Sequence, residues 1–558
     1  MGKILKLIKS EEMWVIFIIV FSVGITVNLF FNEIAQGAKL GPDKFQTFEH
    51  NFLPDFNAYL SKMTQGGKGE WVVHERFTAE PHEGSLLQIF YLILGKITIG
   101  LMGLRPDFAY HLSRFVLAAL RICAAYYFIL AVIPGKGKKV LRILSLALFV
   151  FSGNFPLKIT NPAEFGIFIG ADKYRMFFDT WSNLDPLIRL SYLPHWLAAQ
   201  GILMICLGFL VKLARQANPL KLSVVIGILG ALGGFILPSA SIIIVPVWFL
   251  FILFFKRNLK MFSGFLVGSL IIGIPLLYIS WVMQFYPWKA LSLSDQGAML
   301  KFPWVSYITA LGATGIIGAI GALVFSGASL INFFRKKEVN FGTAIVVLWA
   351  GVVFLSIWFF DTFLHYDQRR FIQVGVELPL AIMTVYLLKN IKNYLLIIIF
   401  GVLLIPSVFV WYISYQSRVT FIRDRINASY PFVSYTPYVV YQPRDWMEAI
   451  FWLSKNTTVD DVVFTDYVAG NYIAAYGGNR VYVGHGGQTV DYLNKLALVR
   501  AFYTGEMTND EAKLFLMKNY AKYVFAGPQE MEYGGGFIKY TFLKPVIKGT
   551  TTTIYRIE

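Results

Sequence analysis

The stretch PDFNAYLSKMTQGGKGEWVVHERFTAEPHEGSLLQ, residues 54–88, places a dense set of ionisable groups between two apolar segments. It begins with Asp55 directly after a proline and passes through a glycine-rich turn at residues 66–69. A cluster of acids and histidines follows: His74, Glu75, Glu80, His82 and Glu83. A loop that only joins two membrane spans does not need so many ionisable groups beside a low-dielectric phase. We therefore expect a site at a bilayer interface.

The composition around this stretch is that of a membrane protein. Of the 558 residues, 56% are hydrophobic and 17% aromatic, and only 15% are charged, whereas a soluble domain carries about 25% charged residues. The formal net charge is +17, but the lysines and arginines concentrate in short loops between apolar runs, as cytoplasmic connections do. No basic domain stands outside the membrane, so we expect no nucleic acid partner. Cys123 and Cys206 lie in apolar runs and predict no disulfide framework.

The first apolar run, residues 13–31, follows three lysines and is long enough to span a bilayer. No small-residue cleavage site follows it, so we interpret it as an uncleaved helix with a cytoplasmic N-terminus rather than a signal peptide. This places the loop 32–84 outside. Further candidate spans lie at residues 86–104, 109–133, 140–153, 194–213, 220–237, 238–255, 260–282, 304–333, 342–360, 372–388 and 394–413. The sequence predicts a polytopic α-helical membrane protein with about 11–13 membrane segments.

Basic residues set the predicted topology of the later spans. Clusters of lysine and arginine lie at residues 212–221, 256–260, 335–337 and 389–392. By the positive-inside rule these clusters are cytoplasmic. The loops 283–303 and 361–371, and everything after residue 412, then lie outside.

The early spans pose a counting problem. The loops 32–84 and 154–193 both have the character of external loops, so an even number of crossings must separate them. Three apolar segments lie between them, and the basic stretch 135–139 belongs inside. One segment must therefore be re-entrant, interfacial or merged with a neighbour, and we expect the short segment 140–153 to be that one.

After residue 412 the composition becomes that of a water-soluble domain. Residues 443–457 have helical spacing, with three apolar side chains on one face. Two more helices are predicted at residues 490–503 and 508–519, and strands at 460–466, 480–485, 522–528 and the C-terminal tail. We therefore predict a membrane module over residues 1–412 and an extracytoplasmic α/β domain over residues 413–558.

Several polar residues have two interpretations. In the second external loop, Asp172 and Asp179 could bind a divalent metal ion, but a spacing of seven in a loop is no metal signature and surface charges often look the same. His195 follows a proline at the head of a span, where it either faces a site or caps the helix. The sequence GHGGQ, residues 484–488, lacks the order of a phosphate-binding glycine motif, so we interpret it as a loop.

The acids and histidines of residues 74–83 could hold a divalent cation or orient a substrate. No H-E-x-x-H or similar spacing supports a metal. His74 and Glu75 are equally well explained as solvated loop charges. Glu80 and His82, which lie nearer the next apolar segment, are the better candidates for substrate binding.

Three motifs together resemble the GT-C glycosyltransferases, the class of the protein O-mannosyltransferases and the aminoarabinose transferases of lipid A. They are the external Asp55, the segment Glu80-Pro81-His82 and the segment Arg370-Phe371…Pro379. The family typically has H-P-P-L at the place of the second motif and R-Y…P at the place of the third. It often has a D-E pair at the first, whereas here Phe56 follows Asp55. The resemblance covers about residues 10–410. It implies transfer of a hexose or pentose from a polyprenyl-phosphate donor to a glycan, lipid or protein acceptor outside the cytoplasm, with Asp55 at the catalytic position.

The chemistry of such a donor suits one carboxylate. A sugar that leaves from a lipid phosphate departs with a good anion, so the reaction needs only a base to deprotonate the acceptor hydroxyl. A glycosidase would need two carboxylates beside the bond. Asp55 could supply the base and give inverting transfer, or it could only cap the helix that follows it.

A polar cluster at the head of a late span suits the donor's phosphate. Asp367, Arg369 and Arg370 lie on the predicted outer side, where the positive-inside rule does not expect arginines. A guanidinium matches two phosphate oxygens, and we predict Arg370 as the main contact with Asp367 orienting it. Snorkelling of the two arginines is the alternative.

The leading hypothesis from the sequence is a multi-pass enzyme of the cell membrane. A transporter or flippase of lipid-linked glycans is the alternative, although transporters place ionisable groups at broken helices in the midplane and here the charges gather in loops. A receptor that only displays its C-terminal domain would leave the polar loops unexplained.

Overall fold

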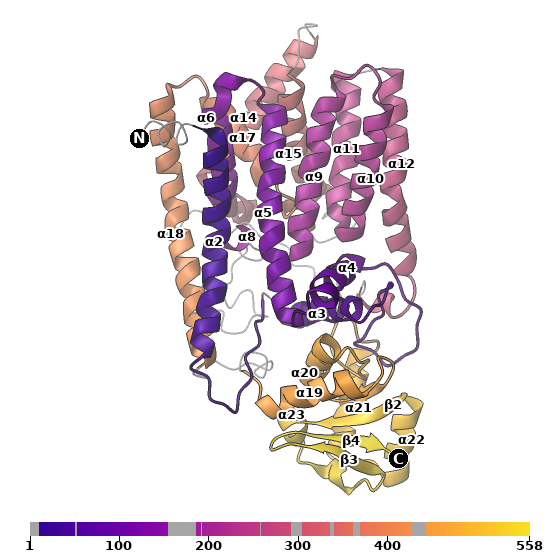
Figure 1. Ribbon diagram of the computed structural model, residues 1–558. Helices are drawn as coiled ribbons and strands as arrows, with labels where there is room; N and C mark the ends of the chain where they lie inside the picture. Colours follow the sequence, from indigo (N-terminus) through magenta and orange to yellow (C-terminus); the bar gives the residue numbers. More distant parts are fainter. Residues whose placement is uncertain are drawn as a thin grey trace. The chain divides into compact units, whose positions relative to one another are not determined.

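The computed structural model describes residues 10–50, 53–153, 186–190, 192–256, 258–291, 304–334, 340–360, 369–426 and 441–558. The chain divides into two compact units (Figure 1). The first, here the helical unit, comprises Met1–Phe31, Arg114–Tyr278 and Met299–Thr420. The second, here the mixed unit, comprises Asn32–Ser113, Ile279–Ala298 and Phe421–Glu558. The predicted first external loop thus folds in the same unit as the C-terminal region.

Helices make up the helical unit; most of them are long and apolar, and Figure 1 shows the long ones running side by side. They are α2 (Glu11–Gly37), α5 (Pro106–Val132), α6 (Lys139–Phe151), α8 (Pro186–Leu190), α9 (Pro194–Leu213), α10 (Leu220–Ile236), α11 (Pro238–Phe255), α12 (Leu259–Val282), α14 (Trp304–Phe334), α15 (Phe341–Phe359), α16 (Arg369–Ile372), α17 (Glu377–Leu388) and α18 (Asn393–Ile426). Four of these helices contain a boundary between the two units, so part of each belongs to the mixed unit: α2, α5, α12 and α18.

The lengths of these helices confirm a multi-pass membrane protein. Within the described part of the chain, seven helices are long and apolar enough to cross a membrane, and four shorter apolar helices accompany them. Most of the predicted spans correspond to one helix each. The predicted span 372–388 is divided by a turn, so its helix α17 begins only at Glu377.

Helices α14 and α17 pack closely because small residues line their contact. A Cβ atom on Gly318 would lie 2.3 Å from the carbonyl oxygen of Leu380, so only glycine allows this approach. The hydroxyl of Thr384 lies 2.9 Å from the carbonyl oxygen of Thr314 on the facing helix. Small residues and hydroxyl bonds are typical of helix contacts in membranes, where the hydrophobic effect cannot drive association. Helix α14 is also interrupted at Gly312, whose φ of 63° is not helical.

A buried ion pair fixes the direction of the first helices of the helical unit. Glu11 at the start of α2 accepts hydrogen bonds from Tyr126 of α5, at 2.7 Å, and from Arg142 of α6, at 2.6 Å. The second half of α5 therefore returns to the end of the unit where α2 begins, and α6 leaves from that end.

The segment 86–104 folds instead within the mixed unit. It forms α4 (Ile89–Gly95) and a π-helix, η1 (Lys96–Leu101), against α3 (Leu53–Gly67). Helices α3 and α4 each have a glycine at their contact. A Cβ atom on Gly66 of α3 would lie 1.9 Å from the carbonyl oxygen of Leu92, and a Cβ atom on Gly95 of α4 would lie 1.9 Å from the carbonyl oxygen of Met63. The segment 86–104 therefore packs against α3 in the mixed unit, and the expectation that 140–153 does not cross the membrane stays a prediction.

The opposite face of α4 and η1 is apolar and exposed. Ile93, Ile97 and Leu101 are 46%, 48% and 84% exposed. The ammonium of Lys96 lies 3.9 Å from the ring centroid of Trp71. An apolar face bordered by a lysine and a tryptophan is typical of a helix that lies along a membrane surface.

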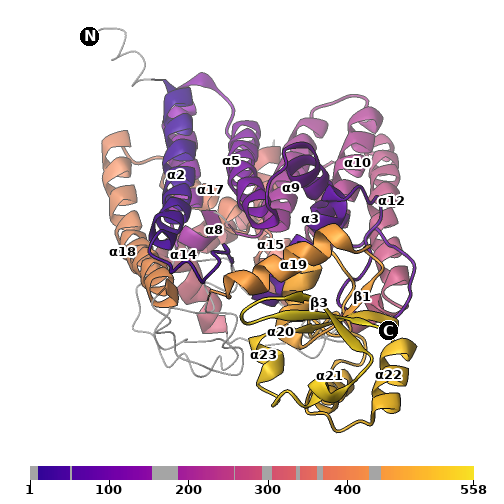
Figure 2. The same ribbon diagram turned by 60° about the horizontal axis from the view of Figure 1, so that its bottom comes forward.

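The C-terminal part of the mixed unit is a three-layer α/β structure. Its sheet has the order β1-β2-β4-β3, with β1 (Val462–Phe464) parallel to β2 (Ala521–Ala526) and antiparallel pairing among β2, β4 (Thr553–Ile557) and β3 (Leu543–Lys548). Helix α19 (Arg444–Asn456) covers one face, and α21 (Tyr492–Tyr503) and α22 (Asn509–Lys518) cover the other (Figure 2). The short helices α20 (Tyr467–Tyr472), η6 (Ile473–Gly477) and α23 (Pro528–Met531) connect these elements.

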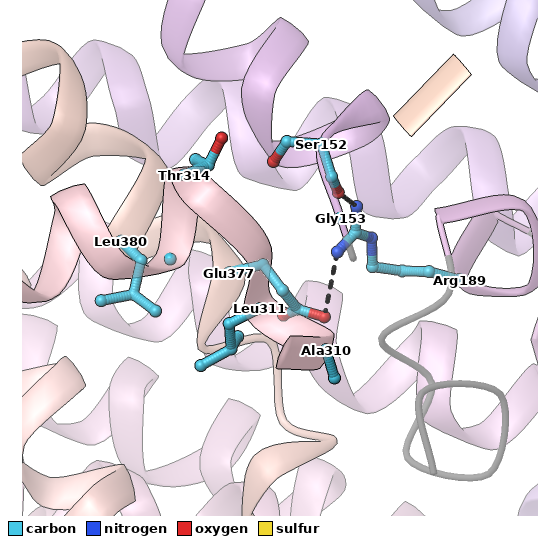
Figure 3. Close-up of a pocket in the computed structure, with 9 residues that line it drawn as sticks. Ser152, Gly153, Arg189, Ala310, Leu311, Thr314, Glu377 and Leu380 are labelled. Atoms are coloured by element: carbon cyan, nitrogen blue, oxygen red, sulfur yellow. Dashed lines mark hydrogen bonds and ion pairs between the residues drawn. The ribbon is translucent and has the colours of Figure 1, made fainter. Parts of the chain in front are cut away.

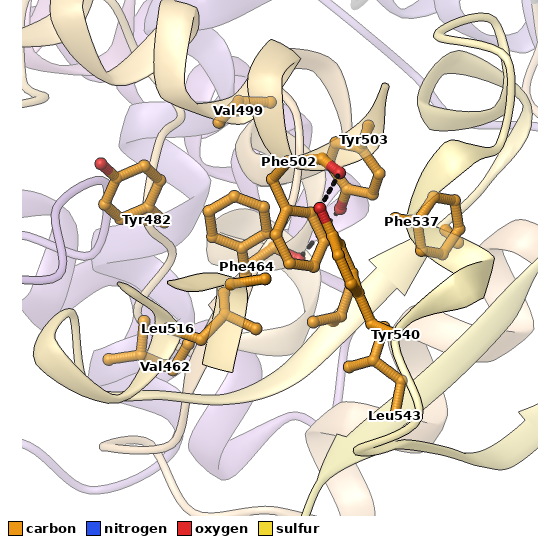
Figure 4. Close-up of a cluster of buried hydrophobic side chains, with 14 of the residues drawn as sticks. Val462, Phe464, Tyr482, Val499, Phe502, Tyr503, Leu516, Phe537, Tyr540 and Leu543 are labelled. Atoms are coloured by element: carbon orange, nitrogen blue, oxygen red, sulfur yellow. Dashed lines mark hydrogen bonds between the residues drawn. The ribbon is translucent and has the colours of Figure 1, made fainter. Parts of the chain in front are cut away.

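The core between the sheet and α21 and α22 is rich in aromatic rings (Figure 4). Phe464 of β1 packs against Phe502 with ring centroids 4.7 Å apart, and the hydroxyl of Tyr503 donates to the carbonyl oxygen of Phe525 at 2.7 Å. Ala79 of the first loop belongs to the same core. The first loop is therefore an integral part of this fold.

The predicted secondary structure of this region is largely confirmed. The three helices predicted at 443–457, 490–503 and 508–519 correspond to α19, α21 and α22. The strand predicted at 480–485 is wrong: Val481 and Val483 form only isolated bridges, to Val463 and to Thr78. The segment is extended because it lies between β1 and the first loop, where each neighbour offers a single pairing position.

Candidate active site

Helix α3 presents Asp55 and Lys62 on one face, because seven residues make two turns of an α-helix. Asp55 stands in the first turn, and its side chain is 46% exposed. The side chain of Lys62 is 0% exposed. The same helix face thus carries an accessible carboxylate and a buried ammonium, and both contact residues of the loop 484–488.

Asp55 is paired with a histidine from the far end of the chain. Nε2 of His485 lies 3.0 Å from Oδ1 of Asp55, and the His485 side chain is 10% exposed. The backbone N–H of Gly487 donates to Nδ1 of His485 at 3.1 Å. A ring nitrogen that accepts a hydrogen bond carries no proton, so these bonds assign the ring proton to Nε2, which donates to Asp55.

Lys62 joins the first loop to the loop 484–488. Its Nζ donates to Oε1 of Gln488 at 2.7 Å and to Oε2 of Glu75 at 3.2 Å. Burial lowers the pKa of Lys62, and the charge and hydrogen bond of Glu75 act against that change. Glu75, whose side chain is 3% exposed, is therefore a buried partner of Lys62 rather than a solvated loop charge.

Glu80 remains partly accessible and binds a lysine of α21. Its Oε1 lies 2.6 Å from Nζ of Lys495, and its side chain is 44% exposed. Burial alone would raise the pKa of Glu80, but the ammonium of Lys495 and the hydroxyl of Thr78 lower it. The carboxylate is thus held ionised, with part of its surface open.

His82 has both ring nitrogens engaged within the protein. Nδ1 lies 2.8 Å from the carbonyl oxygen of Glu80, and the backbone N–H of Glu75 donates to Nε2 at 2.8 Å. These partners assign the proton to Nδ1. Burial lowers the pKa of the imidazole, which keeps it neutral. In this conformation His82 shapes the loop that carries Glu75 and Glu80, and substrate binding by His82 stays a prediction.

His74 belongs to a separate network. Its Nδ1 lies 3.0 Å from Oε2 of Glu70, whose other oxygen accepts a hydrogen bond from the buried Arg76 at 2.6 Å. Its backbone N–H donates to the side chain of Gln65 on α3 at 2.8 Å. These contacts fix the turn between α3 and the residues of the site.

The other predicted substrate residues lie in the helical unit. His195 is half-buried in the first turn of α9, next to the ring of Trp196. The charge of Arg370 on α16 acts on His195. Arg369 begins the short helix α16. Asp367 lies outside the described residues.

The helical unit also contains a polar pocket (Figure 3). Arg189 of α8 donates to the carbonyl oxygen of Ser152, and its Nη1 lies 3.5 Å from Oε1 of Glu377. Both side chains are at most 6% exposed. Thr314 and Leu380 complete the wall, and the space between the walls is about 250 Å³, including its open side. Within the described part of the chain, no hydrogen-bond partner reaches Oε2 of Glu377 or Oγ1 of Thr314.

The predicted metal ligands cannot be placed. Asp172 and Asp179 lie outside the described residues. Among the residues that the structure does describe, no group of three or more His, Cys, Asp and Glu side chains could hold a metal ion. Metal binding by the second loop stays a prediction.

Sequence reasoning missed the residues that complete the surroundings of Asp55: Lys62, His485, Gln488 and Lys495. The available signal was GHGGQ, which contains the one histidine of the sequence after residue 412. As a motif it resembles no known ligand site, so only the fold reveals that it lies against α3.

The fold and the site together define a class: a multi-pass membrane protein whose mixed unit joins the first loop to the C-terminal region. No protein-family model matches the sequence, and no curated protein matches it. The structure, in contrast, is similar to several solved structures. The apo oligosaccharyltransferase AglB from Archaeoglobus fulgidus has a TM-score of 0.51 at 13% identity, over 98% of this chain and 74% of AglB.

Two further matches are the arabinofuranosyltransferase AftD from Mycobacteria and ArnT from Cupriavidus metallidurans bound to undecaprenyl phosphate. For AftD the TM-score is 0.51 at 12% identity, over 95% of this chain and 41% of AftD. For ArnT the TM-score is 0.48 at 10% identity, over 96% and 97% of the two chains. AglB and AftD, whose TM-scores exceed 0.5, are GT-C glycosyltransferases. The chain therefore has the GT-C fold, as the motifs predicted.

Proposed function

We propose that the protein transfers a sugar from a polyprenyl-phosphate donor to an acceptor on the extracytoplasmic face of the membrane. The observation that carries this proposal is the position of Asp55: a half-exposed carboxylate at the start of α3, paired with His485 at 3.0 Å, in a chain with the GT-C fold. AglB, a neighbour with this fold, has been solved in complex with an inhibitory peptide and a dolichol-phosphate. A lipid phosphate as leaving group fits a site with one base.

In the proposed reaction the acceptor hydroxyl attacks the anomeric carbon of the sugar. The new carbon–oxygen bond forms as the bond from the anomeric carbon to the phosphate oxygen breaks, and the electron pair stays on the phosphate. Asp55 takes the hydroxyl proton. Because one displacement occurs, the anomeric configuration inverts. Glu80 would bind sugar hydroxyls, His195 and Arg370 would bind the phosphate side of the donor, and any divalent metal held by Asp172 and Asp179 would add positive charge there.

The experiment is to incubate the purified protein in liposomes with a panel of polyprenyl-phosphate hexoses and pentoses and extracts that supply acceptors. Mass spectrometry should detect the free polyprenyl phosphate and a glycosylated product. Absence of both products with every donor would contradict the proposal.

A transporter or flippase of lipid-linked glycans is the second candidate, and one observation favours it. The buried Arg189 and Glu377 lie in the helical unit beside α14, which is interrupted at Gly312, and transporters place charged residues at interrupted helices. The same liposomes distinguish the two functions: a flippase moves the lipid donor between leaflets without releasing its sugar.

A further inference from the structure

The loop 484–488 is fixed to α3 at two points, which is more than a connecting loop requires. His485 contacts Asp55 and Gln488 contacts Lys62, two turns further along the same helix. On its other side, the hydroxyl of Thr489 donates to the carbonyl oxygen of Phe77 at 2.7 Å and accepts from the backbone N–H of Gly484 at 3.1 Å. The imidazole therefore has a defined position relative to Asp55.

The direction of the hydrogen bond between the two residues is also defined. Because Nδ1 of His485 accepts from Gly487, the proton lies on Nε2 and points to Oδ1 of Asp55. A hydrogen bond to a charged acceptor is stronger and more directional than one between neutral groups. It engages one carboxylate oxygen, Oδ1, of a side chain that is 46% exposed.

We propose that His485 is the positioning residue of Asp55, an inference that rests on the proposed sugar transfer. Its Nε2–H holds Oδ1, so that Oδ2 faces the acceptor hydroxyl and receives its proton. His485 keeps its own proton throughout and does not act as a base. The C-terminal region thereby supplies part of the active site, and Lys62 and Gln488 hold the loop that carries it.

A double-mutant cycle tests this role. His485→Ala should lower kcat about ten- to hundredfold, the effect of losing one charge-assisted hydrogen bond, and leave the KM for the lipid donor unchanged. His485→Gln retains an N–H donor near the place of Nε2 and should recover part of the rate. In an Asp55→Asn background, His485→Ala should cause no further loss, because His485 acts only through Asp55.

Asn494→Ala is the matched control, because Asn494 is exposed on α21 and its side chain bonds only locally, to Asp491 at 2.8 Å. It should leave kcat unchanged. If His485→Ala does not fold, the cycle is completed with His485→Gln, measured in the wild-type protein and in the Asp55→Asn variant. Additive losses, or a His485→Ala rate equal to that of the wild type, would overturn the proposal. Absence of transfer by the wild type would instead contradict the proposed function.

A spectroscopic measurement tests the same contact without turnover. The full-length protein is labelled with ¹⁵N-histidine, and the His485 signal is assigned by its loss in His485→Gln. This signal should show a proton on Nε2. That signal should shift in Asp55→Asn. A proton on Nδ1, or no response to Asp55→Asn, would overturn the positioning role.

Discussion

Asp55 is distinguished from an ordinary helix-capping aspartate by its contact with His485. A capping carboxylate binds the backbone N–H groups of its own first turn, whereas here Oδ1 is 3.0 Å from an imidazole that is 430 residues away in the sequence. Sequence reasoning could propose Asp55 because it follows a proline early in a polar loop. It could not find His485, because no local pattern reports a partner so distant.

Other side chains illustrate the same limit. Glu75 was open to interpretation as a solvated charge because its neighbours in sequence are polar. In the structure it is buried, since α3 brings Lys62 to it. The position of a charged side chain depends on which helix covers it, and residues 74–83 alone do not contain that information.

The first prediction at this scale concerns Arg370. Arg370→Lys keeps the positive charge but loses the planar pair of donors that matches a phosphate. We expect turnover (kcat) to fall on the order of tenfold, as for one weakened charge-assisted bond. Arg215→Lys, at a cytoplasmic loop in the predicted topology, should have no effect. If Arg370→Ala binds and uses the donor normally, the assignment is wrong.

At the scale of secondary structure, amphipathic patterns predicted the helices well and the sheet less well. The apolar face of residues 443–457 and the capping residues at the start of 508–519 are local signals, and α19 and α22 lie where these signals predict them. Thr508 and Glu511 make a capping box. Residues 480–485 alternate like a strand but pair at only two isolated positions. Strand pairing depends on partners elsewhere in the chain, so a local pattern cannot decide it.

The prediction at this scale concerns the ends of the parallel strands. Glu530 of α23 is buried and accepts hydrogen bonds from the hydroxyl of Thr465, after β1, and from the backbone N–H of Gly527, after β2. Burial, and then the charge of Asp466, raise the pKa of Glu530 to about 7. The pKa of a glutamate in an unfolded chain is about 4.3. At pH values between this pKa and the raised pKa of the folded state, the folded protein binds more protons than the unfolded protein. The stability of the folded protein therefore falls as the pH rises through this range.

Glu530→Gln removes that titration. The difference in unfolding free energy between wild type and Glu530→Gln should therefore change between pH 5 and pH 7, by at most about 1.4 kcal/mol per pH unit. Thermal unfolding of both proteins in detergent at several pH values measures it. Glu448→Gln, on the exposed side of α19, is the control for replacing a glutamate outside this cluster. A constant difference for Glu530→Gln would contradict the raised pKa.

At the scale of the whole molecule, composition was sufficient to predict a polytopic membrane protein with a C-terminal α/β structure. The relation between the first loop and the C-terminal region was not predictable. Ala79 lies in the same core as Phe464 and Phe502, and Thr78 pairs with Val483. Contacts across about 400 residues leave no periodic trace in a sequence, so the loop was predicted as part of the membrane module.

The positive-inside pattern predicts a cytoplasmic N-terminus and an extracytoplasmic C-terminal region. Two single cysteines test this in a protein without Cys123 and Cys206. A membrane-impermeant maleimide added to intact cells should label Glu506→Cys, on the C-terminal side of α21. It should label Lys389→Cys, at the end of α17, only after the membrane is opened. Labelling of both positions from the same side would contradict the topology.

Sugar transfer by wild-type protein and by Asp55→Asn, measured with one accepted polyprenyl-phosphate sugar, is the most direct test of catalysis at Asp55. Asparagine keeps the shape and the capping ability of aspartate but cannot accept the proton. We expect kcat to fall about a hundred- to ten-thousandfold, the usual contribution of a general base, with an unchanged thermal unfolding temperature. If Asp55→Asn transfers sugar at nearly the wild-type rate, Asp55 is a helix cap and not the base.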